Sequence, residues 1–223
     1  MYWIIFGALF ILSIIASKRV ESKFKKYSKI PMNYGLTGRE VAERMLLDND
    51  IRDVKVQEVN GTLTDHYNPA NKTLNLSHDV YHGTSVAAAA VAAHECGHAV
   101  QHATAYMWLG LRSKLVPMVN ISSRWVSWVL LAGILLVEKF PQLLLVGIIL
   151  FGLTTLFSVV TLPVEINASR RALLWLNTHN ITTSDTHPYA ESALRSAAYT
   201  YVVAAVTSLA TLLYYLMIYL DNR

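Results

Sequence analysis

Four long apolar stretches limit what this chain can fold into more than any other feature of its sequence. They cover residues 2–17, 117–137, 142–162 and 197–220. The last two reach the length of about 20 predominantly apolar residues with which a helix crosses the hydrocarbon core of a bilayer. With 53% hydrophobic and 15% charged residues, the chain is too apolar for an ordinary soluble domain. We therefore expect a mainly α membrane protein with about four transmembrane helices.

A cluster of basic residues after the first stretch predicts how these helices are oriented. The stretch has no basic region before it and no clear small-residue cleavage site after it, so we expect a retained anchor instead of a signal peptide. Basic clusters beside a transmembrane helix stay in the cytoplasm. We expect a multi-pass protein of the cell membrane, with residues 18–115 and 163–196 cytoplasmic, both termini outside, and one domain over residues 1–223. The cluster comprises Lys18, Arg19, Lys23, Lys25, Lys26 and Lys29.

The net charge of +4 does not require a nucleic-acid partner. The basic cluster is explained by the topology and by the attraction of basic residues to anionic lipid. We therefore expect the lipid bilayer as a partner and no nucleic acid. The single cysteine, Cys96, cannot form an internal disulfide, which suits the reducing cytoplasm.

Two helices are predicted in the first cytoplasmic region from their capping residues. Thr37 and Glu40 have the spacing of a capping box, and the apolar periodicity that follows predicts a helix to about Leu47. Ser85 is placed to cap a second, alanine-rich helix over residues 86–103. Its alanines favour helix formation and allow neighbouring helices to approach closely.

The segment between these helices has the pattern of strands. Residues 54–59 alternate between polar and apolar types, Asn60-Gly61 is typical of a two-residue hairpin turn, and residues 62–66 follow on the return side. Residues 72–76 alternate again after a further turn. We expect a small antiparallel β-sheet.

The run His94-Glu95-Cys96-Gly97-His98 lies within the predicted helix over residues 86–103. An HExxH pattern on a helix places two imidazoles one turn apart with a carboxylate beside them, which is typical of a zinc hydrolase. The simpler alternative is a pair of ordinary helix histidines. Cys96 is two residues from each histidine and therefore points to the opposite side of the helix, where we expect it to pack.

A catalytic zinc ion usually has three protein ligands and one open position, so a third ligand is needed. The metzincin pattern is excluded, because Gln101 and Thr104 stand where it requires glycine and the third ligand. His102 continues the histidine face but points past a metal held by the first two histidines. Glu165 follows Pro163, which should break or restart the helix at the cytoplasmic boundary. A carboxylate there could equally be solvated near a helix amino terminus.

The motif and its surroundings resemble the YugP-type neutral zinc metallopeptidases of bacterial membranes, within the wider gluzincin group that includes the heat-shock membrane protease and the CAAX prenyl protease. The resemblance implies a cytoplasmic, zincin-like helical domain with one Zn²⁺ held by His94, His98 and Glu165. The wider group often has Asp four residues after the ligand glutamate, where this chain has Ser169, so Ser169 or Asn167 could support a ligand. The similar segments are residues 65–67, 74–77, 84–89, 94–98, 163–165 and 167–173.

The resemblance implies a zinc-dependent endopeptidase acting on a peptide or membrane-protein substrate at the cytoplasmic face. Glu95 is expected to act as the general base that takes a proton from a zinc-activated water. We expect residues 72–76 to be the edge strand that holds an extended peptide. Tyr201 is our choice for a donor to the oxyanion. The other candidates for this donor are Tyr199, Arg195, His187 and His66.

Two other functions remain open at this point. An intramembrane site-2-type protease would also carry HExxH, but it should bring an Asp-Gly ligand motif, and the sequence contains no Asp-Gly pair. A non-catalytic, zinc-binding membrane scaffold would have no need of Glu95 as a base. The sequence names neither the substrate nor a regulatory membrane partner.

Overall fold

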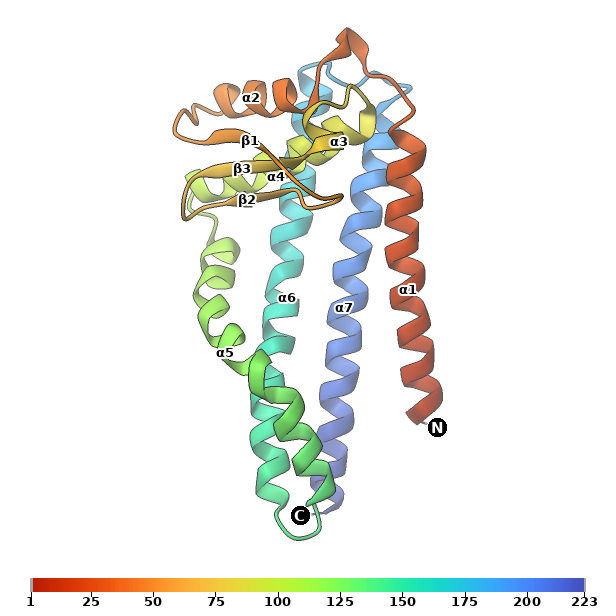
Figure 1. Cartoon of the computed structure of the whole chain (residues 1–223), viewed down its shortest axis with the longest axis vertical. Coiled ribbons are helices and arrows are strands. Elements are labelled where there is room, and N and C mark those ends of the chain that lie inside the picture. Colours follow the sequence, from red (N-terminus) through yellow and green to blue (C-terminus); the bar gives the residue numbers. More distant parts are fainter. Residues whose placement is uncertain (1, 223) are drawn as a thin grey trace. The chain divides into compact units, whose positions relative to one another are not determined.

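The computed structural model describes residues 2–222 and is mainly helical (Figure 1). The chain divides into two compact units. The first unit comprises Met1–Leu9, Met107–Pro163 and Tyr201–Arg223. The second unit comprises Phe10–Tyr106 and Val164–Thr200. The elements in order are α1 (Tyr2–Tyr27), a 3₁₀ turn (Asn33–Gly35), α2 (Gly38–Asp48), β1 (Lys55–Val59), β2 (His66–Asn68), β3 (Thr73–Ser77), α3 (His78–Tyr81), α4 (Val86–Ala103), α5 (Met107–Leu135), α6 (Pro141–Thr178) and α7 (His187–Asp221).

The first unit contains the most apolar parts of the chain. Among the described residues, α5, α6 and α7 are long and apolar enough to cross a membrane, while α1 is not one of these three. The count of four transmembrane helices therefore stays a prediction. Helices α5 and α6 approach closely, since a Cβ added to Gly133 would lie 2.6 Å from the Cα of Leu144. Small residues allow such close packing where the surrounding lipid is as apolar as the helix itself.

Helix α6 continues through Pro163 to Thr178. The prediction that Pro163 breaks or restarts the helix is therefore wrong, and Glu165 lies inside a continuous helix instead of in a first turn. A proline removes one backbone hydrogen bond, and a helix tolerates that loss when packing holds both sides in place. Val160 and Val164, which flank Pro163, are buried.

The sheet has the strand order β1-β3-β2, with β1 parallel and β2 antiparallel to β3 (Figure 1). The prediction of an antiparallel sheet is therefore wrong, because the sheet is mixed and β1 does not pair with β2. A type I′ hairpin turn needs positive φ at both central residues. Only Gly61 of the Asn60-Gly61 pair has it, and Leu63 takes a positive φ of its own. After β1 the chain thus continues as a loop instead of a tight hairpin. Both outer strands, β1 and β2, pair with the buried β3.

The two helix predictions for the polar region after the first apolar stretch are confirmed. Thr37 and Glu40 form a reciprocal capping box at the start of α2. Helix α4 spans Val86–Ala103, and the Ser85 hydroxyl accepts a hydrogen bond from the backbone N–H of Ala88 at 3.2 Å. Cys96 is fully buried and its thiol lies 3.5 Å from the Ala42 carbonyl oxygen, which agrees with a packing role. The core of the second unit forms around these two helices and the sheet.

Candidate metal centre

The second unit brings His94 and His98 of α4 together with Glu165 of α6. The Nε2 atoms of His94 and His98 lie 3.4 and 3.7 Å from Oε2 of Glu165. The two imidazole rings are 4.8 Å apart between centroids, and the Glu165 side chain is only 3% exposed. Three potential ligand atoms from two helices therefore converge on one small space.

This arrangement fits a zinc ion. Two ligands bound at about 2.1 Å to a tetrahedral ion lie about 3.4 Å apart, which is close to the separations measured between the histidines and Glu165. Two imidazole nitrogens and one carboxylate oxygen are also a donor set used by catalytic zinc, which leaves a fourth position open. The residues present thus suit the metal that the sequence motif implies.

Gln101 determines which nitrogen of His98 faces the centre. Its amide nitrogen donates to the Val164 carbonyl at 2.8 Å and to Oδ1 of Asn167 at 3.0 Å. Because both bonds need an N–H donor, the amide oxygen is the atom that lies 3.1 Å from Nδ1 of His98. Nδ1 therefore carries the proton and donates it to Gln101. The lone pair on Nε2 is left to bind a metal.

Ser169 has the same relation to His94. Its hydroxyl lies 3.1 Å from Nδ1 of His94, and it comes from α6, the helix that also carries Glu165. With Nδ1 directed to Ser169, Nε2 of His94 faces Glu165. Ser169 was predicted from the sequence as a possible support of a ligand, whereas the role of Gln101 was not predicted. The signal was available, since Gln101 follows His98 by three residues and lies on the same helix face.

Helices α4 and α6 can approach closely at this centre because Gly97 has no side chain. A Cβ added to Gly97 would lie 2.6 Å from the carbonyl oxygen of Ala168 and 3.0 Å from its Cα. These are backbone atoms, which cannot turn aside as a flexible side chain would. The glycine inside the HExxH motif is therefore what lets α6 bring Glu165 beside the two histidines.

Glu95 of α4 forms a hydrogen bond with the sheet. It is buried, and its Oε2 accepts a hydrogen bond of 3.0 Å from the backbone N–H of Tyr67 in β2. Burial alone would lower the pKa of His98, but the nearby carboxylates of Glu165 and Glu95 outweigh this effect and raise the pKa. The surroundings therefore favour positive charge at the centre.

The other candidate residues are distributed differently. His102 lies 2.9 Å from the hydroxyl of Tyr67 and is not part of the three-ligand group. His66 bonds to Thr64 and Asn75, and His187 bonds to Thr182. Arg195 and Tyr199 line a pocket with residues of α1. Tyr201 belongs to the first compact unit, and its role stays a prediction.

Comparison with known proteins identifies the family of the chain. Residues 2–220 match the family model described as "Putative neutral zinc metallopeptidase". The chain belongs to this family. The "Putative membrane protease YugP" of Bacillus subtilis (strain 168) is 43% identical to it over 212 residues, which cover 95% of this chain and 93% of that protein. No solved structure matches the chain. The family suggested by the sequence motifs is thus confirmed.

Proposed function

We propose that this family member is a zinc-dependent endopeptidase that cleaves peptide bonds at the cytoplasmic face of the membrane. His94, His98 and Glu165 are the proposed ligands of one zinc ion, and Glu95 is the proposed general base. One observation carries the proposal: both histidines direct Nδ1 to a hydrogen-bond partner and Nε2 to the same carboxylate oxygen. Membership of a metallopeptidase family supports peptides as the substrate class.

Each proposed residue has a distinct role. Zinc, when bound, would acidify a water molecule and polarise the substrate carbonyl. Glu95 would accept the proton from the water and deliver it to the leaving amine. The Tyr67 backbone N–H donates to Oε2 of Glu95 and so keeps the carboxylate in one orientation. Oε1 would then accept and release the proton. Tyr201 is retained as the proposed donor to the oxyanion.

The substrate-binding strand proposed from the sequence has to be revised. The expectation that residues 72–76 form an edge strand is wrong, because β3 is the central strand and both its sides are paired. Strand β2 is at the edge of the sheet, and its residue Tyr67 contacts Glu95. We propose that an extended peptide pairs with β2, beside the general base.

Cross-linking distinguishes the two edges of the sheet. A photoreactive residue is placed at His66 in β2 or at Lys55 in β1, two exposed positions, in a Glu95→Gln background that slows turnover. Peptide substrate should cross-link at position 66 and not at position 55. Cross-linking at position 55 alone would move the substrate to the opposite edge.

Zinc content and cleavage together test the proposed function. Glu95→Gln should keep one zinc ion per chain and lose peptide cleavage, because it removes the base and none of the ligands. Glu165→Ala should lose the metal. Glu43→Gln, which changes an exposed carboxylate paired with Arg39, is the matched control and should change neither property. Cleavage that persists in Glu95→Gln would reject the base, and a full metal content in Glu165→Ala would reject the third ligand.

The same variant can be used to identify the class of substrates in cells. Peptide termini of membrane and cytosolic proteins are compared in cells carrying Glu95 or Glu95→Gln, and termini that disappear in the variant identify the substrates. Identical termini in both strains would favour the alternative of a non-catalytic scaffold.

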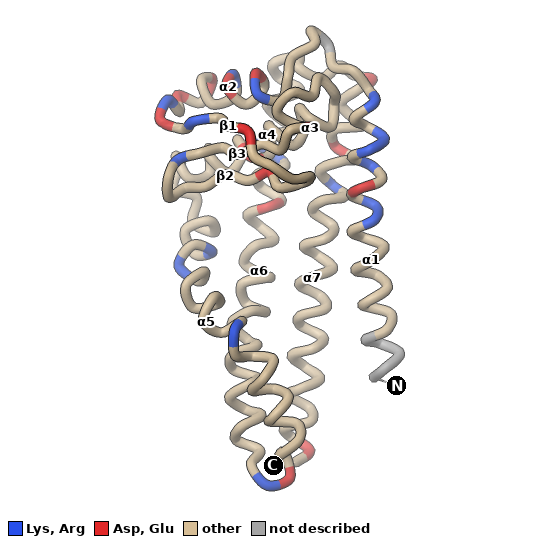
Figure 2. Tube along the Cα trace, in the orientation of Figure 1, with Lys and Arg blue, Asp and Glu red and all other residues tan. Residues whose placement is uncertain are grey.

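The orientation in the membrane is proposed from the basic cluster on α1. Figure 2 shows Lys and Arg gathered on the part of α1 that follows its apolar stretch. Four spans would then place both polar regions inside and both termini outside. Cysteines introduced near Lys25 should resist a membrane-impermeant thiol reagent in intact cells, and cysteines near Lys139 should react. The opposite labelling would place the metal centre outside.

A further inference from the structure

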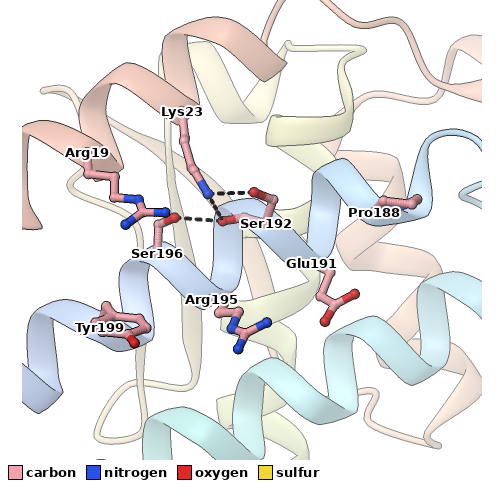
Figure 3. A pocket seen from close by; sticks show the side chains of 8 residues that line it. All are labelled: Arg19, Lys23, Pro188, Glu191, Ser192, Arg195, Ser196 and Tyr199. Carbon is pink, nitrogen blue, oxygen red and sulfur yellow. Dashed lines mark hydrogen bonds between the residues drawn. The ribbon is translucent and has the colours of Figure 1, made fainter.

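A pocket of about 420 Å³ lies between α1 and α7 in the second unit (Figure 3). Three basic side chains line it, Arg19 and Lys23 from α1 and Arg195 from α7, together with a single acidic residue, Glu191. The pocket therefore carries an excess of positive charge. It is separate from the proposed zinc ligands, none of which lines it.

The guanidinium groups of Arg19 and Arg195 have N–H donors available to bind a ligand. Lys23 is already held, because its Nζ donates to the carbonyl oxygen and the hydroxyl of Ser192 at 3.2 and 2.5 Å (Figure 3). By contrast, the guanidinium groups of Arg19 and Arg195 make no ion pair or hydrogen bond with the residues whose side chains the structure describes. Each guanidinium offers five N–H donors in a planar fork that matches phosphate oxygens. Tyr199 adds an exposed phenol to the same pocket.

The pocket lies where apolar sequence meets polar sequence on both helices. On α1, the exposed apolar side chains Phe10, Ile11 and Ile15 are followed directly by the basic residues. On α7, Arg195 comes just before the apolar stretch over residues 197–220. This junction is the level at which the phosphates of a bilayer would lie, with acyl chains alongside the exposed apolar part of α1.

We propose that this pocket binds the phosphate group of an anionic phospholipid. Arg19 and Arg195 would hold the phosphate oxygens from two different helices, and Tyr199 would donate a further hydrogen bond. Such binding would join α1 to α7 and hold the second unit against the bilayer surface. Free inorganic phosphate presents the same oxygens, but it lacks the acyl chains that the apolar part of α1 would contact.

Native mass spectrometry of the full chain in a neutral detergent tests the proposal, with dioleoylphosphatidylglycerol, dioleoylphosphatidylcholine and inorganic phosphate as separate probes. The wild type should bind phosphatidylglycerol in preference to phosphatidylcholine. The double variant Arg19→Gln/Arg195→Gln should bind phosphatidylglycerol about 30-fold more weakly, since each basic residue near a membrane surface adds about a fivefold preference for anionic lipid. Both positions are exposed, so zinc content and thermal unfolding should be unchanged.

The matched control removes the same number of charges, both of them from α1. Lys18→Gln/Lys25→Gln changes two exposed residues of α1 that do not line the pocket. Phosphatidylglycerol binding should fall much less in this variant. An equal loss in both double variants would overturn the proposal in favour of unspecific charge attraction. Inorganic phosphate that binds with the same dependence on Arg19 and Arg195, and displaces the lipid at millimolar concentration, would overturn the choice of a lipid.

Discussion

The amide oxygen of Gln101 lies 3.1 Å from Nδ1 of His98, and this contact decides which imidazole nitrogen faces Glu165. Gln101 is fully buried, and its amide nitrogen is fixed by two acceptors on α6. One side chain therefore orients a proposed zinc ligand and also ties α4 to α6. From the sequence alone, Gln101 served only to exclude the metzincin pattern.

Removing this support should weaken zinc binding without removing a ligand. Gln101→Leu leaves Nδ1 of His98 without its acceptor, and zinc affinity should fall about 10- to 100-fold. Ser169→Ala should have a similar effect through His94, and Ser169→Thr, which keeps the hydroxyl, should restore most of it. Affinity is measured by competition with a chromogenic chelator.

The control for these variants is Thr178→Ala, which lies on the same helix as Ser169. The Thr178 hydroxyl bonds mainly within its own helix, to the Leu174 carbonyl at 2.9 Å. Its loss should leave zinc affinity unchanged. Wild-type zinc affinity in Gln101→Leu would show that His98 does not need Gln101 to present Nε2.

Gly97→Ala should separate α4 from α6. The added Cβ would meet the backbone of Ala168 at 2.6 Å, and two helices cannot relieve that contact without moving apart. Both zinc content and thermal stability should fall. Gly110→Ala is the control, because Gly110 also lies in a helix but has nothing within 4 Å of an added Cβ. That change should be neutral or stabilising, since alanine favours helix. Equal stability of the two variants would mean that the contact with Ala168 is relieved without cost.

The capping box should make a measurable contribution to the local stability of α2. Thr37→Ala removes the acceptor for the Glu40 backbone N–H, which lies 3.2 Å from the Thr37 hydroxyl. A lost N-cap typically costs about 1 kcal/mol. Amide hydrogen exchange over residues 38–48 should report this loss as a lower free energy of opening. Ser28→Ala, at an exposed hydroxyl that donates to the Lys25 carbonyl, should leave exchange in α2 unchanged.

The same cap predicts a pH dependence. The Thr37 backbone N–H and then its hydroxyl donate to Glu40, and they hold the pKa of this carboxyl below its ordinary value of 4.5. Because the folded pKa is the lower one, the stabilisation is complete above pH 4.5 and is lost as pH falls through the folded pKa. Exchange in α2 should show this loss in the wild type and not in Glu40→Gln. Comparison at each pH cancels any effect of metal release, which both proteins share. A parallel pH dependence in the two proteins would exclude Glu40 as its source.

The sequence alone determined the features that depend on neighbours a few residues apart. The caps at Thr37 and Ser85, the alanine-rich helix between Val86 and Ala103 and the HExxH spacing all act within one or two helical turns. The apolar stretches indicated a membrane protein for a similar reason, because hydropathy adds up along a single helix. These local signals were sufficient to identify the family.

Only the tertiary structure decided what depends on residues far apart in the chain. The turn at Asn60-Gly61 fits a hairpin locally, but β1 and β2 both pair with the buried β3, because burying a strand on both sides outweighs one turn preference. Pro163 fits a helix start locally, yet packing carries α6 through it and places Glu165 beside the histidines. Gln101 contacts α6, and Tyr67 contacts Glu95. Both contacts join segments that are far apart in the sequence, so the periodicity of residue types along one helix or strand cannot predict them.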